Sequence, residues 1–169
     1  MKKGVIVALV VLIALMVGIF LFNANVEVEY VPEVEIEEAD MRKTMVALYF
    51  QNAETRELQK ETRLIDSKEL LLDPYEELLK MLVNGPESDF LAKTIPEGTR
   101  ILGVELVGDV LQVNVSKEFV ENRPQDENEQ RNCVNSIVNT LTELNEVSAV
   151  KFLIEGQEAE GFQEPFHKM

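Results

Sequence analysis

The sequence is poor in the side chains that most often carry out chemistry. Its 169 residues include one cysteine, one histidine and no tryptophan. A single cysteine excludes a disulfide within the chain, and one cysteine with one histidine cannot supply a Cys/His zinc site. His167 lies close to the last residue, where we expect an exposed side chain rather than the centre of a catalytic triad.

The short motifs of catalysis and nucleotide binding are also missing. The sequence contains no GxSxG, no P-loop, no GxGxxG and no HExxH. Glu76 and Glu77 are expected on the solvent side of a helix, where they support its N-terminal dipole. A group of four acids lacks the spacing of an EF-hand loop: Glu121, Asp126, Glu127 and Glu129. We therefore predict no enzyme, with no catalytic residue, metal site or cofactor.

The lone Cys133 is expected to begin the second helix of the domain. A helix N-terminus can lower the pKa of a thiol and make it reactive. Cys133 also adjoins apolar positions, which favour its interpretation as a small core residue.

Basic residues are few, because 16 Lys and Arg stand against 31 Asp and Glu, giving a net charge of −15. Such a surface would not release counterions from nucleic acid, and it would be repelled by anionic lipid headgroups. Solubility is the simple interpretation of this charge. It excludes nucleic acid as a partner and leaves basic proteins open.

Residues 4–22, GVIVALVVLIALMVGIFLF, contain no charge. As a helix they would rise about 28 Å, close to the roughly 30 Å of hydrocarbon in a bilayer. Lys2 and Lys3 precede them, so the positive-inside rule places the N-terminus in the cytoplasm and the rest outside. We predict that residues 1–22 form a cytoplasmic stub and a single-pass anchor in the cell membrane. The alternative is a cleaved signal peptide, although the run is long and Ala24 lacks a small partner two residues away.

Residues 23–43, NANVEVEYVPEVEIEEADMRK, hold seven acids and no glycine. Charged linkers extend by self-repulsion, so we predict an extracytoplasmic spacer. The alternation of Val and Glu also suits a strand that pairs with a partner's sheet edge, although Pro32 interrupts it.

Residues 44–169 carry the periodicities of a folded domain. TMVALYFQN (44–52) predicts a central strand, and the more polar ELQKETRLID (57–66) predicts an outer one. A helix follows, with Asp73 as its N-cap, Pro74 at its first position and Gly85 as a left-handed terminator. The region 87–100 is expected to connect, with one helical turn around 89–92.

A hairpin is predicted over residues 101–116, with Leu102, Val104 and Leu106 on one face of its first strand. Residues 117–132 are expected to form a loop that leads into the second helix. That helix should end near Asn145 and bury one apolar stripe: Val134, Ile137, Val138, Leu141 and Leu144.

A final strand is predicted over residues 148–156, followed by a tail that is ordered only if Phe162 and Phe166 dock. The order β-β-α-β-β-α-β predicts an α+β fold with two helices on one mainly antiparallel or mixed sheet.

From Val46 to Phe166 the chain resembles the GerMN domain family. The matching segments are, in order, VALYF, LQKETR, ELLKMLVNGP, IPEGTRILGVEL, DVLQVNVSKEF, IVNTLTELNEVSAVKFLIEG and GFQEPF. The resemblance implies a small α/β module, present here in a single copy, outside the membrane of a spore-forming or related Gram-positive bacterium. It implies a role in sporulation or germination through protein–protein contact, and it supplies no catalytic residue.

We therefore predict a membrane-anchored extracytoplasmic interaction module of the sporulation, germination or cell-envelope machinery. Its expected partners are envelope or sporulation-complex proteins, or further copies of itself. The alternative is a domain that binds a peptidoglycan fragment or another small ligand in a concave pocket.

Overall fold

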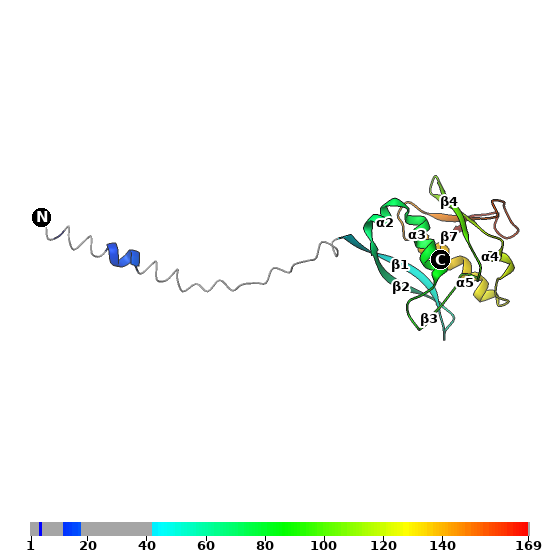
Figure 1. Cartoon of the computed structure of the whole chain (residues 1–169), viewed down its shortest axis with the longest axis horizontal. Helices are drawn as coiled ribbons and strands as arrows, with labels where there is room; N and C mark the ends of the chain where they lie inside the picture. The colour runs from blue at the N-terminus through cyan, green and yellow to red at the C-terminus, as the bar shows by residue number, and fades with distance from the viewer. Residues whose placement is uncertain (1–3, 5–11, 18–41, 169) are drawn as a thin grey trace. The chain divides into compact units, whose positions relative to one another are not determined.

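The computed structural model describes Gly4, residues 12–17 and residues 42–168 (Figure 1). Most of the predicted anchor, residues 1–22, and nearly all of the predicted spacer, residues 23–43, lie outside this part. The anchor and the spacer therefore stay predictions.

Contacts divide the chain into two units, Met1–Ile36 and Glu37–Met169. In the first unit, residues 12–17 are helical and their side chains are exposed. Within the described residues, no helix has both the length and the apolar character that crossing a bilayer requires.

The first sheet of the second unit is antiparallel, in the order β2-β1-β3. Its strands are β1 (Lys43–Asn52), β2 (Leu58–Asp66) and β3 (Leu91–Ala92). The predicted central position of the first strand and outer position of the second are confirmed. Alternate β1 side chains enter the core, because Val46, Leu48 and Phe50 are at most 8% exposed. β1 and β2 pair without interruption over nine residues, from Lys43 opposite Asp66 to Gln51 opposite Leu58.

The second sheet has the order β4-β5-β6-β7. Its strands are β4 (Ile101–Val107), β5 (Val110–Val115), β6 (Ala149–Ile154) and β7 (Phe166–His167). β5 and β6 are parallel, and the other two pairs are antiparallel. The domain is α+β as predicted, but the expectation of one sheet is wrong.

The predicted hairpin is confirmed as β4 and β5, with Gly108 at its turn in the left-handed region (φ 68°). The predicted face of β4 is wrong at one position. The register shifts between Ile101 and Gly103, so Leu102 is turned outward and is 42% exposed. Ile101 packs against the core where Leu102 was expected to. A bulge adds one residue to a strand, so the inward and outward alternation of side chains is reversed before the bulge relative to after it.

Four helices occur among the described residues of this unit: α2 (Ser67–Leu72), α3 (Pro74–Asn84), α4 (Glu118–Glu121) and α5 (Glu127–Leu141). The signals at both ends of α3 are confirmed. The Asp73 carboxylate accepts a hydrogen bond from the Glu76 amide at 3.2 Å, and Gly85 has φ 98°.

The prediction for the second helix is wrong at both ends. α5 begins at Glu127, because the Asp126 carboxylate accepts the amide hydrogens of Asn128 and Glu129 and caps it there. It ends at Leu141, ahead of Asn145. The predicted loop over residues 117–132 therefore holds α4 and the first turns of α5.

The short elements α2, β3, α4 and β7 were not predicted and are added to the expected order. β3 replaces the helical turn expected around residues 89–92. The tail docks, since Phe162 is 2% exposed and both Phe162 and Phe166 join a ring cluster with Phe119 and Phe152. Neighbouring ring centroids in this cluster are 5.5–6.1 Å apart.

Helix α5 lies between the two sheets, because it contacts β1 of the first and β6 and β7 of the second. The predicted apolar stripe is buried, with Leu144 only partly so. Polar residues on other sides of α5 are buried too, including Ser136 and Thr140. Thr140 Oγ1 accepts a hydrogen bond from the Tyr49 amide at 3.1 Å, which connects α5 to the side of β1 that faces away from β2.

Candidate interaction surface

Cys133 lies inside α5 and is 2% exposed, and its Sγ donates to the Glu129 carbonyl at 3.1 Å. Burial raises the pKa of its thiol to about 11. A thiolate is the nucleophilic form, so burial of Cys133 disfavours its nucleophilic form at neutral pH. The interpretation of Cys133 as a core residue is confirmed, and its placement at the helix N-terminus is wrong.

Five of the six acids considered in the sequence have structural partners, and Glu121 pairs with Lys117. Asp126 caps α5, Glu129 forms an ion pair with Arg56, and Lys80 forms ion pairs with both Glu76 and Glu77. Within the part of the chain that the structure describes, no three His, Cys, Asp or Glu side chains are grouped to hold a metal ion. His167 is exposed on β7, with Nδ1 3.3 Å from the Ser148 carbonyl oxygen.

The sheet edges differ in how well they could accept another strand. Natural edges are commonly blunted by shortness or by bulges, which prevent unwanted pairing. Among the described strands, β3 and β7 have two residues each and β4 carries the bulge at Ile101–Gly103. β2 is neither short nor bulged, because it is nine residues long, contains no proline and pairs regularly along its whole length; its charged residues are Lys60, Glu61, Arg63 and Asp66.

The backbone groups that β2 presents at its edge follow from the ladder. The Tyr49 amide donates to Thr140 instead of to β2, and Gln51 pairs with β3. Backbone groups of alternate residues point to the same side of an antiparallel strand. Tyr49 and Gln51 point away from β2, so the alternate β1 residues Val46, Leu48 and Phe50 form the hydrogen bonds to β2. On β2, the N–H and C=O groups that point away from β1 therefore belong to Lys60, Thr62 and Leu64.

A groove of about 510 Å³ runs beside this edge. One side is formed by β2 residues from both of its faces, Gln59 to Thr62. The other side is the segment Ser88–Leu91 that enters β3, in which the Phe90 side chain is 76% exposed. The turn between β1 and β2 closes one end, where the Ala53 amide donates to the Phe90 carbonyl at 2.9 Å.

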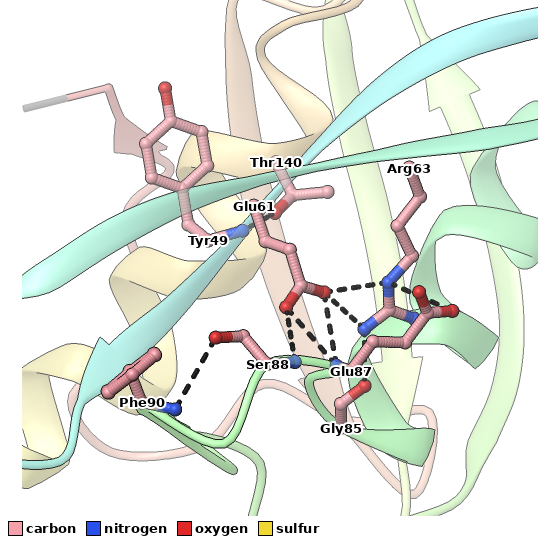
Figure 2. Close-up of polar contacts among 8 residues, drawn as sticks. All are labelled: Tyr49, Glu61, Arg63, Gly85, Glu87, Ser88, Phe90 and Thr140. Carbon is pink, nitrogen blue, oxygen red and sulfur yellow. Dashed lines mark hydrogen bonds and ion pairs between the residues drawn. The ribbon is translucent and has the colours of Figure 1, made fainter.

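An ion pair between Glu61 and Arg63 fixes that segment in place (Figure 2). Arg63 Nε and Nη2 donate to Glu61 Oε1 at 2.7 and 2.5 Å. The Ser88 amide donates to Glu61 Oε2 at 3.0 Å, and the Glu87 amide lies 3.2 Å from the same oxygen. Arg63 Nη2 also donates to the Gly85 carbonyl at 2.7 Å. One ion pair thus connects β2 to the end of α3 and to the wall of the groove.

The electrostatics of this pair favour its charged form. Desolvation would raise the pKa of Glu61, but the hydrogen bonds from Arg63, Ser88 and Glu87 outweigh it and hold the pKa below its usual range. The two side chains are only 11% and 9% exposed. The Arg63 guanidinium also lies over the Phe50 ring, 5.4 Å from its centroid.

Apolar side chains are exposed at the other end of β2. Met45 and Leu64 are opposite each other across β1 and β2 and are 72% and 64% exposed. Leu71 and Leu72, on the helix α2 that follows β2, are 84% and 77% exposed. Exposed apolar residues that gather in this way are typical of a contact surface.

Sequence reasoning placed β2 at an outer position but missed this surface. Glu61 is paired across the sheet with Leu48, and Arg63 is paired with Val46. Charged residues paired with core residues were a usable signal for an unusual environment. No local pattern indicated that residues 85–90 would lie against them, because that contact joins distant parts of the chain.

The protein-family model described as "Germane: Sporulation and spore germination" matches residues 47–160. Comparison with curated proteins gives no match.

The fold is similar to solved structures of the sporulation protein GerM from Bacillus subtilis. The structure of its tandem GerMN domains aligns with a TM-score of 0.64 at 19% identity, covering 81% of this chain and 50% of that one. This chain therefore spans half of the tandem structure. The structure of the first GerMN domain aligns with a TM-score of 0.58 at 19% identity, covering 75% and 93% of the two chains.

Proposed function

Since this chain belongs to the Germane family of sporulation and spore germination domains, we propose that it is a non-enzymatic protein–protein interaction module held on the outside of the cell membrane. In this proposal it is a component of the sporulation, germination or cell-envelope machinery. Residues 4–22 would anchor it and the acidic residues 23–43 would separate the domain from the lipid. The uncharged run and the two lysines before it support this placement.

The observation that carries the proposal is the edge of β2 that no other strand among the described residues pairs with. It offers the outward backbone groups of Lys60, Thr62 and Leu64 beside a groove. Addition of a partner's strand to such an edge is a common mode of recognition, in which backbone hydrogen bonds supply affinity and neighbouring pockets supply specificity. Here Phe90 would contact the side chains of the incoming strand.

The Thr62→Pro variant tests this proposal in the full-length chain. Proline removes the outward N–H of Thr62 without removing a hydrogen bond between β2 and β1. Thr62→Ala is the matched control, because it changes the side chain and keeps the amide. Tagged chains would be crosslinked in the cells that make them and purified, and the captured proteins identified by mass spectrometry.

We expect the wild-type and Thr62→Ala chains to capture the same envelope or sporulation-complex proteins, and the Thr62→Pro chain to lose them. Circular dichroism would verify that all three chains are folded. Equal capture by a folded Thr62→Pro chain would refute the binding of envelope or sporulation-complex proteins at the β2 edge.

The groove also favours a second candidate function, the binding of a peptidoglycan fragment or a similar small ligand. Its volume falls in the range of about 300–1,000 Å³ that is usual for ligand sites, and it includes polar side chains from Asn52, Gln59 and Ser88. Titration of the protein with defined muropeptides by calorimetry distinguishes the two functions. Saturable heat that Phe90→Ala abolishes would favour the ligand.

A further inference from the structure

We infer that the β2 edge binds the β2 edge of a second copy of this chain, antiparallel and about a two-fold axis at Thr62. This inference rests on the proposed function, because it names a partner for the same surface. A two-fold contact uses one surface twice, so that surface must be complementary to itself. Three properties of β2 meet this requirement.

The first property is the position of the outward backbone groups. Hydrogen bonds between two copies form only where outward residues of one strand face outward residues of the other. Placing Thr62 opposite Thr62 satisfies this condition, and it sets Lys60 opposite Leu64. It is also the antiparallel register in which all nine residues from Leu58 to Asp66 overlap.

The second property is charge. With the axis at Thr62, Glu61 of each copy faces Arg63 of the other, which extends the ion pair already present within each copy. Moving the axis one residue toward either end would set Glu61 against Glu61 or Arg63 against Arg63. Like charges directly opposite each other destabilise strand pairing. The charges on β2 therefore select this register over its nearest alternatives.

The third property is the distribution of exposed apolar residues at the two ends of the strand. Phe90 lies near Gln59 on the segment that enters β3, whereas Leu71 and Leu72 lie on α2 after Asp66. Figure 1 shows α2 and β3 toward opposite ends of β2. All three side chains are more than three-quarters exposed. An antiparallel two-fold contact brings unlike ends together, so Phe90 of each copy would approach α2 of the other.

Cysteine crosslinking of the full-length chain in its membranes tests the inference. Residues paired across an antiparallel ladder have Cα atoms about 5.5 Å apart, which lies within the range of disulfides. Under mild oxidation, Thr62→Cys should give a crosslinked dimer. Glu105→Cys is the control, because Glu105 is an exposed residue of the bulged edge strand β4. The native Cys133 is buried and should give no dimer in the wild-type chain.

We expect Thr62→Cys to form dimers at least about tenfold faster than Glu105→Cys, because a disulfide needs Cα atoms within about 7 Å. Equal rates would overturn the inference. The register is tested by mixing Lys60→Cys and Leu64→Cys chains that carry different tags. The mixed dimer should dominate, since two Lys60 residues would be about 13 Å apart along the strands. Faster crosslinking of Lys60→Cys with itself would overturn the proposed register.

Failure of this inference is distinguishable from failure of the proposed function. If Thr62→Pro loses envelope proteins but Thr62→Cys does not crosslink to itself, the edge binds another protein and self-pairing is refuted. If Thr62→Cys crosslinks to itself and capture of envelope proteins is unchanged in Thr62→Pro, self-pairing stands and the β2 edge is not where other proteins bind.

Discussion

Replacing Glu61 by glutamine tests how the wall of the groove is held. The carboxylate accepts from two nitrogens of Arg63 and from the amides of Glu87 and Ser88. A glutamine side chain has one acceptor oxygen, so either the guanidinium or the two amides lose their partner. Arg63, which is 9% exposed, would also lose its closest counter-charge.

The expected cost can be bounded from these contacts. Losing a hydrogen bond to a charged group costs about 1.5–3 kcal/mol, and breaking a buried ion pair by removing one partner costs about 3–5 kcal/mol. The pair is slightly exposed, and Arg63 keeps the Gly85 carbonyl and a contact with Glu87 at 3.7 Å. We therefore expect a loss of about 2–3 kcal/mol in the free energy of unfolding. The midpoint of thermal unfolding should fall by roughly 6–15 °C.

The effect should depend on pH in a defined direction. The pKa of Glu61 is lower in the folded protein than its ordinary value of about 4.3–4.5. Its carboxylate therefore contributes full stability above that ordinary value, and the contribution is lost as the pH falls through the folded pKa. The difference between wild type and Glu61→Gln should be largest near neutral pH and should shrink below about pH 4.

Urea unfolding of both chains between pH 3.5 and pH 7, followed by circular dichroism, measures this difference. Glu105→Gln is the control, because Glu105 is an exposed acid on β4. A difference below about 0.5 kcal/mol at pH 7, within the usual range for surface substitutions, would refute the reasoning. A difference that stays constant across this pH range would refute the assigned role of the Glu61 charge.

Three further substitutions or treatments test other parts of the account. Thr140→Val should lower the free energy of unfolding in urea by about 1–2 kcal/mol, because the Tyr49 amide loses its acceptor. Thr140→Ser keeps a hydroxyl acceptor and should retain most of the wild-type stability. Phe162→Ala should cost about 3–5 kcal/mol and make the tail sensitive to limited proteolysis, and a protease-resistant tail would contradict its docking on Phe152. Cys133, whose pKa burial raises to about 11, should react with a thiol reagent at pH 8 only after denaturation, and rapid labelling of the native chain would contradict its burial.

Local signals in the sequence were sufficient to predict several elements. Asp73, Pro74 and Gly85 define the ends of α3 by capping and backbone conformation, which depend on nearest neighbours alone. The contrast between an apolar β1 and a polar β2 was sufficient to predict which strand is central. The start of α5 could also have been predicted, because Asp126 is a good N-cap and Glu129 stands where a capping box has an acid.

The division into two sheets depends on contacts between distant residues. α5 buries Ser136 and Thr140 along with its apolar stripe, because it has a sheet on more than one side. No periodicity in α5 alone indicates that environment. The outward turn of Leu102 requires a bulge at Gly103, which exists only once β4 pairs with β5.

The candidate surface was predictable only in part. An outer β2 follows from its polar pattern, but the fact that this edge is neither short nor bulged matters only once the other edges are known. The Glu61–Arg63 pair is visible in the sequence as alternate charges. Its contact with Ser88 depends on where α3 ends in space.

The central claim is that the edge of β2, rather than a reactive side chain, performs the task of this domain. The most direct test is a photocrosslinking amino acid at Thr62 of the full-length chain, in the cells that make it, with Glu105 as the matched site. We predict discrete protein adducts from Thr62, either with a second copy or with an envelope protein, and no comparable adducts from Glu105. Adducts from Glu105 but none from Thr62, in cells where the chain is stable and correctly located, would contradict the claim.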